Sequence, residues 1–460
     1  MGGLPRRATI VDSLKAEDAE AALFVVDAGN FSMKNSRISA EARPQQRRKA
    51  EAILDAFARD PIDALGIGSK ELRLGVDWIQ EAVASRNLPA TLANLSCDGL
   101  KPFPGHQVVV RDGARVGFVG VMSNTSIDGC TVSDGAAALR AEISAMGPLN
   151  MLVVFGHGSN QDDEALAEAV PEIDVIVNGQ ARVTRTTPEL LPNGAVQLGA
   201  GSRGKKLGVA SILMVDGADG FSNTDALDDL KDRRETYDRR LESARRNLDA
   251  EEETARARAE WQLTFFTEKI AELDAEIDAI EESGVSRSHR ISVELVPLGR
   301  SVDDHPAVLA MLETAKAEIE ALEAGAAVAE LTQSEYIGSV ACSGCHAEIF
   351  AQWQETAHAR TYATLQVENR ELDRDCFSCH VTGAFDERGP QHPTQVTAPL
   401  QNVGCESCHG PGRKHIAAPG QGTVVRSPGE DNCVQCHDGK QDEGRFELSA
   451  YLPRVQHRSP

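Results

Sequence analysis

The sequence predicts a multidomain protein in which an α/β region with an inserted pair of long helices precedes a region of short helices and irregular chain. Over residues 1 to about 220, short apolar runs alternate with amphipathic stretches, which is typical of an α/β domain with a buried sheet. Residues 224–283 contain neither Gly nor Pro and are rich in Asp, Glu, Arg and Ala, which favours long exposed helix. A chain of 460 residues also exceeds what one hydrophobic core usually supports.

Five apolar runs are expected to form the buried strands of the α/β region: Leu23–Asp27, Asp63–Ile67, Val116–Val121, Met151–Phe155 and Ile173–Val177. Amphipathic stretches such as 45–59 and 161–170 lie between them and are expected to be helices. Strands that alternate with helices in this way indicate an α/β domain with a buried sheet.

Residues 224–283 are expected to fold as an antiparallel helical hairpin with coiled-coil packing. Apolar side chains recur at steps of three and four in both halves, at Leu230, Tyr237, Leu241, Ala244 and Leu248, and at Phe266, Ile270, Leu273, Ile277 and Ile280. One straight helix would carry the chain about 90 Å away, yet Arg290–Val296 has the pattern of a strand that returns to the first domain. We therefore expect a turn near Asp249–Ala255, which would bring the second helix back toward the first domain. The alternative is a long helix that dimerises with a second chain.

Four Cys-x-x-Cys-His motifs lie near the end of the chain, with the cysteine pairs Cys342 and Cys345, Cys376 and Cys379, Cys405 and Cys408, and Cys433 and Cys436. This pattern predicts four covalently bound c-type haems. The two thiols anchor the ring, and the next residue supplies the proximal iron ligand, at His346, His380, His409 and His437. A pair of zinc ribbons is the alternative reading, but zinc gives no reason for a histidine after every cysteine pair.

The other histidines of this segment limit the second iron ligand. No methionine follows Met311, so His–Met ligation from within the segment is excluded. Four further histidines match the four motifs in number, so every haem can be bis-histidine: they are His358, His392, His415 and His457. A histidine that instead lies on the surface or binds a haem propionate would leave one iron open to a small ligand.

Residues 336–460 resemble the tetrahaem cytochrome c-554 family, whose members are electron carriers associated with hydroxylamine oxidation. The resemblance rests on four segments in the family's order and spacing: Tyr336–Cys342, Trp353–His358, Cys379–Gly383 and Val403–Pro411. It implies that His358 and His415 are axial ligands. The family includes one five-coordinate haem, so the resemblance also allows an open iron here.

The first domain resembles the 5′-nucleotidase branch of the calcineurin-like metallophosphoesterases over roughly residues 2–325. The matching segments follow the family's order: they are Gly2–Thr9, Val26–Asn30, Ala64–Gly68, Leu191–Gly204 and Val293–Pro297. The resemblance implies the family's α/β sandwich. The predicted division of the chain is therefore residues 1–222 and 288–325 for this domain, 223–287 for the hairpin, 326–334 for a linker and 335–460 for the tetrahaem domain.

The resemblance implies a two-metal site whose motifs are altered in this sequence. Asn30 replaces the metal-bridging Asp. Ser69 replaces a metal ligand, and Lys70 replaces the catalytic imidazole. The family's Gly-His-x-His motif reads Gly-Gln-Ala-Arg here, at residues 179–182. Only His157 matches a metal-ligand position, and one imidazole cannot hold two metals. We therefore expect a phosphatase fold without phosphatase chemistry and assign no catalytic residue. Lys70 and Arg182 are expected to be ordinary surface or salt-bridged residues, with an anion-binding pocket as the alternative.

Charge and compartment limit the partners. A net charge of −23 argues against nucleic acid, and the acidic tetrahaem segment favours redox proteins with a basic docking face. Haem attachment outside the bacterial cytoplasm implies a periplasmic protein, although Met1–Arg7 lacks the apolar core of a signal peptide and no apolar run is long enough to span a membrane. Our hypothesis is that the start of this sequence is placed too late, which would account for both the missing leader and the missing Asp-x-His motif of the phosphoesterases. Cys97 and Cys130 can form a disulfide or remain two buried thiols.

Taken together, the sequence favours a periplasmic electron-transfer protein with four haems on a catalytically degenerate scaffold, which also offers a route to a homodimer through the helical insertion. The alternative is a multihaem oxidoreductase that acts on a small nitrogen or sulfur oxyspecies at an open haem. A weaker alternative is a metal-dependent phosphohydrolase or nucleotidase with a redox appendage.

Overall fold

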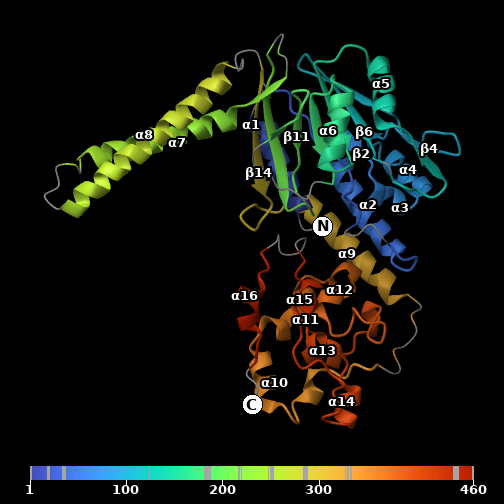
Figure 1. The fold of residues 1–460 in the computed structure, drawn as a ribbon. Helices are drawn as coiled ribbons and strands as arrows, with labels where there is room; N and C mark the ends of the chain where they lie inside the picture. Colours follow the sequence, from blue (N-terminus) through green and yellow to red (C-terminus); the bar gives the residue numbers. More distant parts are fainter. Residues whose placement is uncertain are drawn as a thin grey trace. The chain divides into compact units, whose positions relative to one another are not determined.

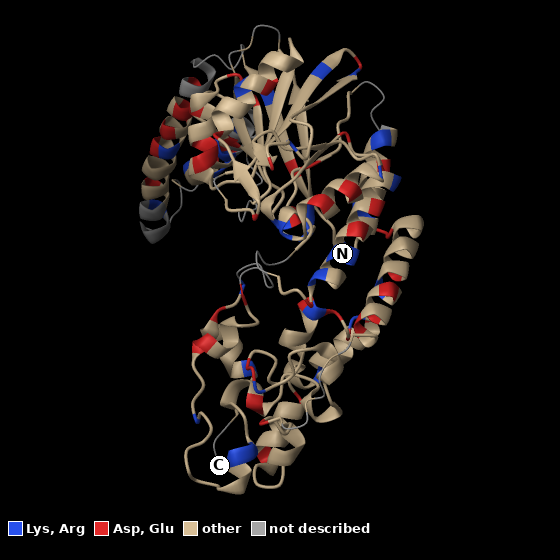
Figure 2. Cartoon of the chain, turned by 90° about the vertical axis from the view of Figure 1, so that its right-hand side faces the viewer, with Lys and Arg blue, Asp and Glu red and all other residues tan. Residues whose placement is uncertain are grey.

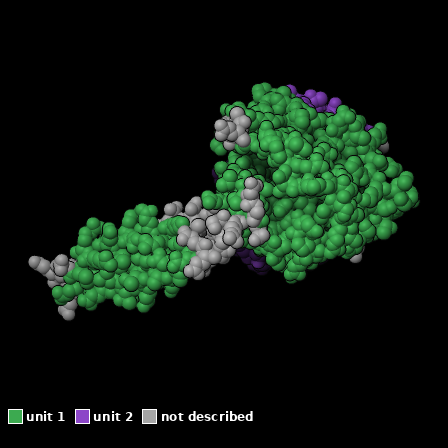
Figure 3. All heavy atoms as spheres, turned by 90° about the horizontal axis from the view of Figure 1, so that it is seen from above, with its two compact units in different colours: residues 1–36, 53–308 green, residues 37–52, 309–460 purple. Residues whose placement is uncertain are grey.

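A computed structural model describes residues 3–17, 21–33, 38–123, 125–180, 188–201, 203–215, 218, 220–246, 248, 253–282, 288–326, 328, 331, 334–438 and 445–457. The chain forms two compact units (Figures 1 and 3): unit 1 comprises residues 1–36 and 53–308, and unit 2 comprises residues 37–52 and 309–460. Residues 37–52 and 309–325, which the sequence places in the first domain, therefore fall in unit 2. The boundaries of the insertion and the linker stay predictions.

The central sheet of unit 1 has six strands in the order β10-β11-β9-β8-β6-β5. Its middle strands are parallel: β6 (Ala114–Val121), β8 (Met151–Gly156), β9 (Val175–Asn178) and β11 (Val196–Leu198). The edge strands β5 (Gln107–Arg111) and β10 (Glu189–Leu190) pair antiparallel. A smaller parallel sheet joins β1 (Val26–Asp27), β2 (Ala64–Gly66) and β3 (Ala90–Thr91). Each of the five predicted strands is confirmed.

Side chains alternate between the two faces of the central sheet, as strand geometry requires. One face, with Leu152 and Val154, packs on α5 (Gly135–Met146) and α6 (Asn160–Ala169). The opposite face, with Phe118, Val153 and Phe155, packs toward β14 (His289–Pro297). The remaining helices of this region are α1 (Leu4–Glu17), α2 (Arg43–Arg59), α3 (Ser69–Arg73) and α4 (Val76–Ala84). The predicted helices at 45–59 and 161–170 are α2 and α6, so both are confirmed.

The inserted helices lie between two strands of a third sheet. This sheet has the order β12-β14-β13, with β12 (Lys206–Leu213) antiparallel and β13 (Phe221–Asn223) parallel to β14. The helices α7 (Thr224–Arg246) and α8 (Glu253–Glu282) follow β13 and precede β14 (Figure 1). The predicted returning strand is therefore confirmed.

The two inserted helices run antiparallel, because positions that advance along one helix meet positions that recede along the other. Arg234 Nε lies 2.6 Å from Asp274 Oδ1, and the rings of Tyr237 and Phe266 stack with centroids 5.8 Å apart. Most of the predicted apolar seam is buried, at Leu241, Ala244, Phe266, Ile270, Leu273 and Ile277. The predicted turn at Asp249–Ala255 falls largely outside the described residues, and coiled-coil geometry stays a prediction.

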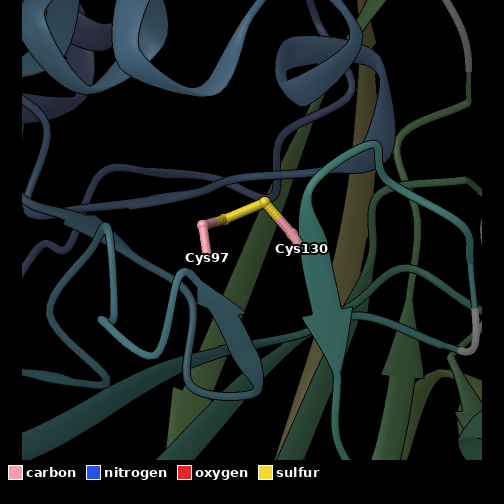
Figure 4. Close-up of a disulfide and its surroundings, with 2 residues drawn as sticks. All are labelled: Cys97 and Cys130. Carbon is pink, nitrogen blue, oxygen red and sulfur yellow. A yellow bond between two sulfur atoms is a disulfide. The ribbon is translucent and has the colours of Figure 1, made fainter.

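A small two-stranded sheet in unit 1 carries the disulfide. Cys97 in β4 (Leu95–Cys97) and Cys130 in β7 (Cys130–Val132) are direct antiparallel partners and are bonded to each other (Figure 4). Of the two alternatives for these cysteines, the structure has the disulfide.

Unit 2 is mostly helical and irregular, as predicted. It contains the first residues of α2, most of α9 (Pro306–Ala324), and a series of short helices: α10 (Ala347–Gln354), α11 (Thr361–Val367), α12 (Arg374–His380), α13 (Cys405–His409), α14 (Arg413–Ala417), α15 (Glu430–Val434) and α16 (Leu448–Tyr451). A small apolar cluster of Tyr362, Leu365, Phe377 and Val381 joins α11 to α12. Across the described ranges, no helix is both long and apolar enough to cross a membrane.

Candidate haem centres

The four Cys-x-x-Cys-His motifs lie on single helical turns in unit 2. The second and third motifs end α12 and make up α13. In the first and fourth motifs, the amide nitrogens of His346 and His437 each lie 2.9 Å from the carbonyl oxygen of the residue four positions earlier. A helical turn places residues i, i+3 and i+4 on one face, so each motif presents two thiols and an imidazole on the same side. All eight cysteines are free thiols in this structure.

Three proximal histidines face a second histidine ring. The ring centroids of His346 and His415 lie 6.4 Å apart, those of His437 and His358 lie 6.2 Å apart, and those of His409 and His457 lie 5.8 Å apart. Two imidazoles on opposite sides of one metal, each bonded at about 2 Å, have ring centres about 6 Å apart. The structure thus brings three of the four predicted distal histidines to the spacing that one iron between two rings requires.

Unpaired nitrogens in these pairs also fit a missing metal. Nδ1 of His415 and Nδ1 of His457 are buried and have no hydrogen-bond partner in the part of the chain that the structure describes. A buried ring nitrogen without a partner is costly unless something coordinates it. The donor set of two thiols and two imidazoles at each of these sites therefore fits haem c.

His380, the proximal histidine of the second motif, has a different environment. Its Nδ1 donates to the carbonyl oxygen of Thr361 at 2.7 Å, which fixes the tautomer and leaves Nε2 able to bind a metal. His409 is oriented in the same way by the carbonyl oxygen of Val425 at 2.6 Å. Among the described residues, however, no second histidine ring pairs with His380.

The structure argues against the expected role of His392 as a distal ligand. Its Nε2 lies 2.8 Å from Glu323 Oε2, and its Nδ1 lies 2.7 Å from Thr394 Oγ1. Burial and the nearby Arg374 lower the pKa of His392. Because both ring nitrogens are used inside the fold, His392 has no free lone pair for iron. These contacts do not place His392 at an iron, and the assignment of four distal histidines to four haems stays a prediction.

Short contacts hold the motifs near one another. The side chains of Cys342 and Cys405 touch, and the Cys405 amide donates to Ser339 Oγ at 3.0 Å, which joins the first motif to the third. Asn432 Nδ2 donates to the Cys408 carbonyl oxygen at 2.7 Å, which joins the third motif to the fourth. The structure therefore places the third motif in contact with both the first and the fourth.

The second motif is tied to the segment that carries His358. The amide of Val403 lies 3.2 Å from the His358 carbonyl oxygen and 3.1 Å from Thr361 Oγ1, and Thr361 is the residue whose carbonyl oxygen accepts from His380. Trp353 Nε1 donates to the Val403 carbonyl oxygen at 3.0 Å. The tryptophan of the family-like segment therefore fixes the backbone around His358.

Glu406 is a supporting residue to which the sequence assigned no role. Its buried carboxylate accepts from three backbone amides, those of Ile337 at 3.0 Å, Gly338 at 2.7 Å and Gly412 at 2.7 Å. It therefore fastens the third motif to the start of the cytochrome-like segment and to the turn before His415. Its place inside a Cys-x-x-Cys pair was the only sequence signal, and such positions accept many residue types.

The phosphoesterase-like positions of unit 1 lie together, and several of their polar groups face the backbone, although Asn30 Nδ2 is buried without a partner among the described residues. His157 is 1% exposed, with Nε2 2.5 Å from the Ala28 carbonyl oxygen and Nδ1 3.3 Å from that of Val121. Burial lowers the pKa of His157. Glu71 is fully buried and accepts from the amides of Asn30 at 2.8 Å and Ser32 at 2.9 Å.

The altered motif positions of unit 1 join the same backbone network. Asn30 adopts a left-handed conformation, with φ 59°, and its Oδ1 accepts from the Lys70 amide at 3.2 Å. Ser69 begins α3, and the amide of Gln180 donates to Asn178 Oδ1 at 2.7 Å. Arg182 lies outside the described residues. No cluster of three or more His, Cys, Asp or Glu side chains suited to a metal occurs within the described ranges.

Comparison with known proteins matches both regions of the chain. Residues 341–410 match the family of cytochrome c554 and c-prime. Cytochrome c-554 of Nitrosomonas europaea is 35% identical over 91 residues, which cover 16% of this chain and 38% of that protein. The uncharacterized metallophosphoesterase YunD of Bacillus subtilis is 31% identical over 159 residues, which cover 32% of each. The chain thus spans about a third of the length of these curated relatives.

Three solved structures are similar at low identity. The sulfate thiohydrolase SoxB of Thermus thermophilus has a TM-score of 0.46 and 13% identity, over 74% of this chain and 49% of that one. The 5′-nucleotidase precursor of Thermus thermophilus has a TM-score of 0.44 and 17% identity, over 73% and 55%. The calcineurin-like phosphoesterase YfkN of Bacillus subtilis has a TM-score of 0.43 and 14% identity, over 70% and 89%. The sequence matches indicate that the chain joins a metallophosphoesterase-like region to a region similar to the cytochrome c554 family, and that family implies covalently bound haem c.

Proposed function

We propose that this protein is a periplasmic tetrahaem cytochrome that carries electrons between redox partners. The observation that carries the proposal is the spacing of three histidine ring pairs, 5.8 to 6.4 Å between centroids, each beside a free Cys-x-x-Cys pair. When bound, haem supplies reversible one-electron chemistry whose potential depends on its axial ligands, burial and nearby charge.

In this proposal the protein anchors and orients the haems and keeps them close. The cysteine pairs would hold each ring, and His346, His409 and His437 would bind the irons. His415, His457 and His358 complete those three sites. The contacts between the first, third and fourth motifs, and between the second motif and the His358 segment, keep the four sites in one small unit.

A second candidate function follows from the site at Cys376 and Cys379. His380 has no ring partner among the described residues, and His392 is committed to Glu323 and Thr394. The haem held there would keep an open position for a small ligand. This favours, as the alternative, an oxidoreductase that acts on a small nitrogen or sulfur oxyspecies at this site.

The phosphoesterase-like region serves in this proposal as a scaffold without hydrolytic chemistry. Support comes from His157 and Glu71, whose polar atoms are occupied by the backbone. The inserted helices α7 and α8 carry acidic and basic side chains along their length (Figure 2). We propose this pair as the route to a homodimer, and a redox partner with a basic docking face for the acidic cytochrome-like region.

Spectroscopy of the matured protein tests both candidates. The haem count is first measured by mass and by haem absorbance, with four expected. Electron paramagnetic resonance and optical spectra of the oxidised protein, recorded with and without nitric oxide, are expected to show three low-spin haems and one high-spin haem that binds the ligand. Four low-spin haems that are all inert to nitric oxide would remove the oxidoreductase. Fewer than four attached haems would overturn the tetrahaem assignment itself.

A further inference from the structure

The first part of α2 belongs to unit 2, although it lies far from the cytochrome-like region in the sequence. Three residues of this helix contact the chain at the start of α12: they are Gln45, Gln46 and Lys49. Gln45 is fully buried, its Nε2 donates to the Leu372 carbonyl oxygen at 2.9 Å, and its Oε1 accepts from the Arg374 amide at 3.0 Å. One side-chain amide therefore pairs with the backbone on both sides of Asp373.

Lys49 binds the same stretch through charge. It is 5% exposed, and its Nζ pairs with Asp373 Oδ1 and lies 2.6 Å from Asp375 Oδ2. Burial acts to lower the pKa of Lys49, but Asp373 and Asp375 outweigh burial and raise it above its ordinary value. The ammonium is therefore charged inside the fold.

The carboxylates that Lys49 binds also begin the helix of the second haem motif. Asp373 is the N-cap of α12, and its Oδ1 accepts from the Asp375 amide at 3.0 Å, which supplies a partner for an otherwise unpaired helix amide. The helix contains Cys376 and Cys379 and ends at His380. Its placement therefore sets the placement of the entire second motif.

The helix α9 also binds α12, through an ion pair. Arg374 Nε donates to Glu323 Oε2 at 2.9 Å, and Glu323, which is 1% exposed, is also the partner of His392. Arg370 Nε donates to Asp373 Oδ2 at 3.0 Å. The second motif is thus surrounded by paired charges, of which Lys49 and Glu323 lie outside the segment 341–410 that matches the cytochrome family.

From these contacts we propose that Lys49 is a positioning residue for the haem attached at Cys376 and Cys379. It fixes the start of α12 through Asp373, and its charge offsets the two carboxylates beside that haem. The proposal rests on the proposed attachment of haem at this motif. It implies that the cytochrome is completed by residues 43–52, so the fusion to the preceding region is part of the haem site.

The test replaces Lys49 by Gln in the full, haem-loaded chain, because Gln keeps a hydrogen-bond donor and removes the charge. Removing the positive charge of Lys49 disfavours reduction of the nearby haem, because the added electron is no longer stabilised by that charge at low effective dielectric. We therefore expect the reduction potential of the high-spin haem to fall. The expected change is on the order of tenfold in the reduction equilibrium constant, which is about 59 mV for one electron. The low-spin signals of the other three haems are expected to stay in place.

Three further variants separate charge from structure. Lys49→Arg keeps the charge and is expected to restore the potential, Asp375→Asn is expected to raise it, and the double variant Lys49→Gln with Asp375→Asn is expected to return it toward the original value. Arg48→Gln is the matched control. Arg48 is the preceding residue and carries the same charge, but it pairs with the exposed Glu318, so its loss is expected to leave the potential unchanged.

The outcomes are distinguishable. Equal shifts in the Lys49→Gln and Arg48→Gln variants, or reduced stability of Lys49→Gln with no change in potential, would overturn the proposal. If Lys49→Gln fails to mature, the Asp375→Asn variant tests the proposal instead. A haem potential that does not rise in Asp375→Asn would also overturn the proposal. Absence of haem on Cys376 and Cys379 in the unaltered protein, found by mass before any potential is measured, would instead be a failure of the proposed function.

Discussion

Buried polar groups are satisfied in different ways in the two units. In unit 1, both ring nitrogens of His157 face carbonyl oxygens and the Glu71 carboxylate is covered by backbone amides. In unit 2, Nδ1 of His415 and Nδ1 of His457 are buried without a partner among the described residues. Since a buried polar atom without a partner is costly and these two nitrogens belong to rings that face proximal histidines, the comparison indicates that these histidine pairs hold an added group, whereas His157 and Glu71 face the backbone.

Two buried carboxylates, one in each unit, have different kinds of partner. Asp163 in unit 1 is 2% exposed and is bound by the neutral amides of Asn178 and Gln197, and burial raises its pKa to about 6. In unit 2, burial would raise the pKa of Asp373 as well, but Lys49 and Arg370 hold it well below the usual range. Neutral donors satisfy the geometry of a carboxylate, but only cations also compensate its charge.

The largest expected effect comes from removing a distal histidine. Replacing His415 by Ala is expected to convert one low-spin haem to high-spin, because the ring that faces His346 is lost. Replacing His392 by Ala is expected to leave the number of low-spin haems unchanged, because His392 binds Glu323 and Thr394. Electron paramagnetic resonance of the oxidised proteins measures both. Loss of a low-spin signal in the His392 variant would show that His392 is an iron ligand, and would contradict the distinction between its hydrogen-bonded nitrogens and the unpaired nitrogen of His415.

The next effect compares two carboxylates that are bound by backbone amides, one in each unit. Glu406→Ala and Glu71→Ala each leave buried amides unpaired, which costs about 1–3 kcal/mol for each amide, so we expect losses on the order of 4 kcal/mol in both. Unfolding in urea, followed by circular dichroism, measures the loss.

The haem spectrum separates these two variants. Glu406→Ala is expected to disturb it, since Glu406 lies in the third motif and binds the amide of Gly412 shortly before His415. Glu71→Ala is expected to leave it unchanged. An altered haem spectrum in the Glu71 variant would contradict the separation between a closed site in unit 1 and an open one in unit 2.

Local pattern accounts for what the sequence predicted well. The strands and the inserted helices are set by spacings of a few residues, and the five predicted strands and both helices are found where predicted. Partners distant along the chain could not be predicted in this way: Glu323 lies 69 residues before His392, and Lys49 lies 324 residues before Asp373. Counting histidines gave four candidates for the distal ligand, but only the fold shows that Glu323 binds one of them.

A smaller effect concerns pH. The folded pKa of Asp163 is raised from 3.8 to about 6, so the folded state binds the proton more tightly than the unfolded state between these values. Stability therefore falls as pH rises through this window and stays lower above it. Asp163→Asn removes the charge and keeps an oxygen for Asn178 and Gln197, so we expect a gain of up to about 3 kcal/mol at pH 8 and little change at pH 4.

Thermal unfolding of unit 1 at both pH values measures this effect. A residual slope between pH 4 and 6 is expected in the variant, because burial also raises the pKa of Asp27 to about 6. Equal stability of the variant and the original protein at pH 8 would show that neutral donors compensate the charge of Asp163 after all, which removes the contrast with Asp373.

The smallest expected effect is that of added divalent metal on unit 1. A metal that binds the folded state at a hundred times its dissociation constant would stabilise it by about 2.7 kcal/mol. We expect no such shift with manganese or zinc, because His157 and Glu71 already use their polar atoms within the backbone network. The measurement is the melting temperature of unit 1 with and without metal, alongside hydrolysis of a phosphate ester. A metal-dependent rise in both would show that the backbone contacts open to admit metal, and would restore the phosphohydrolase as the function of this region.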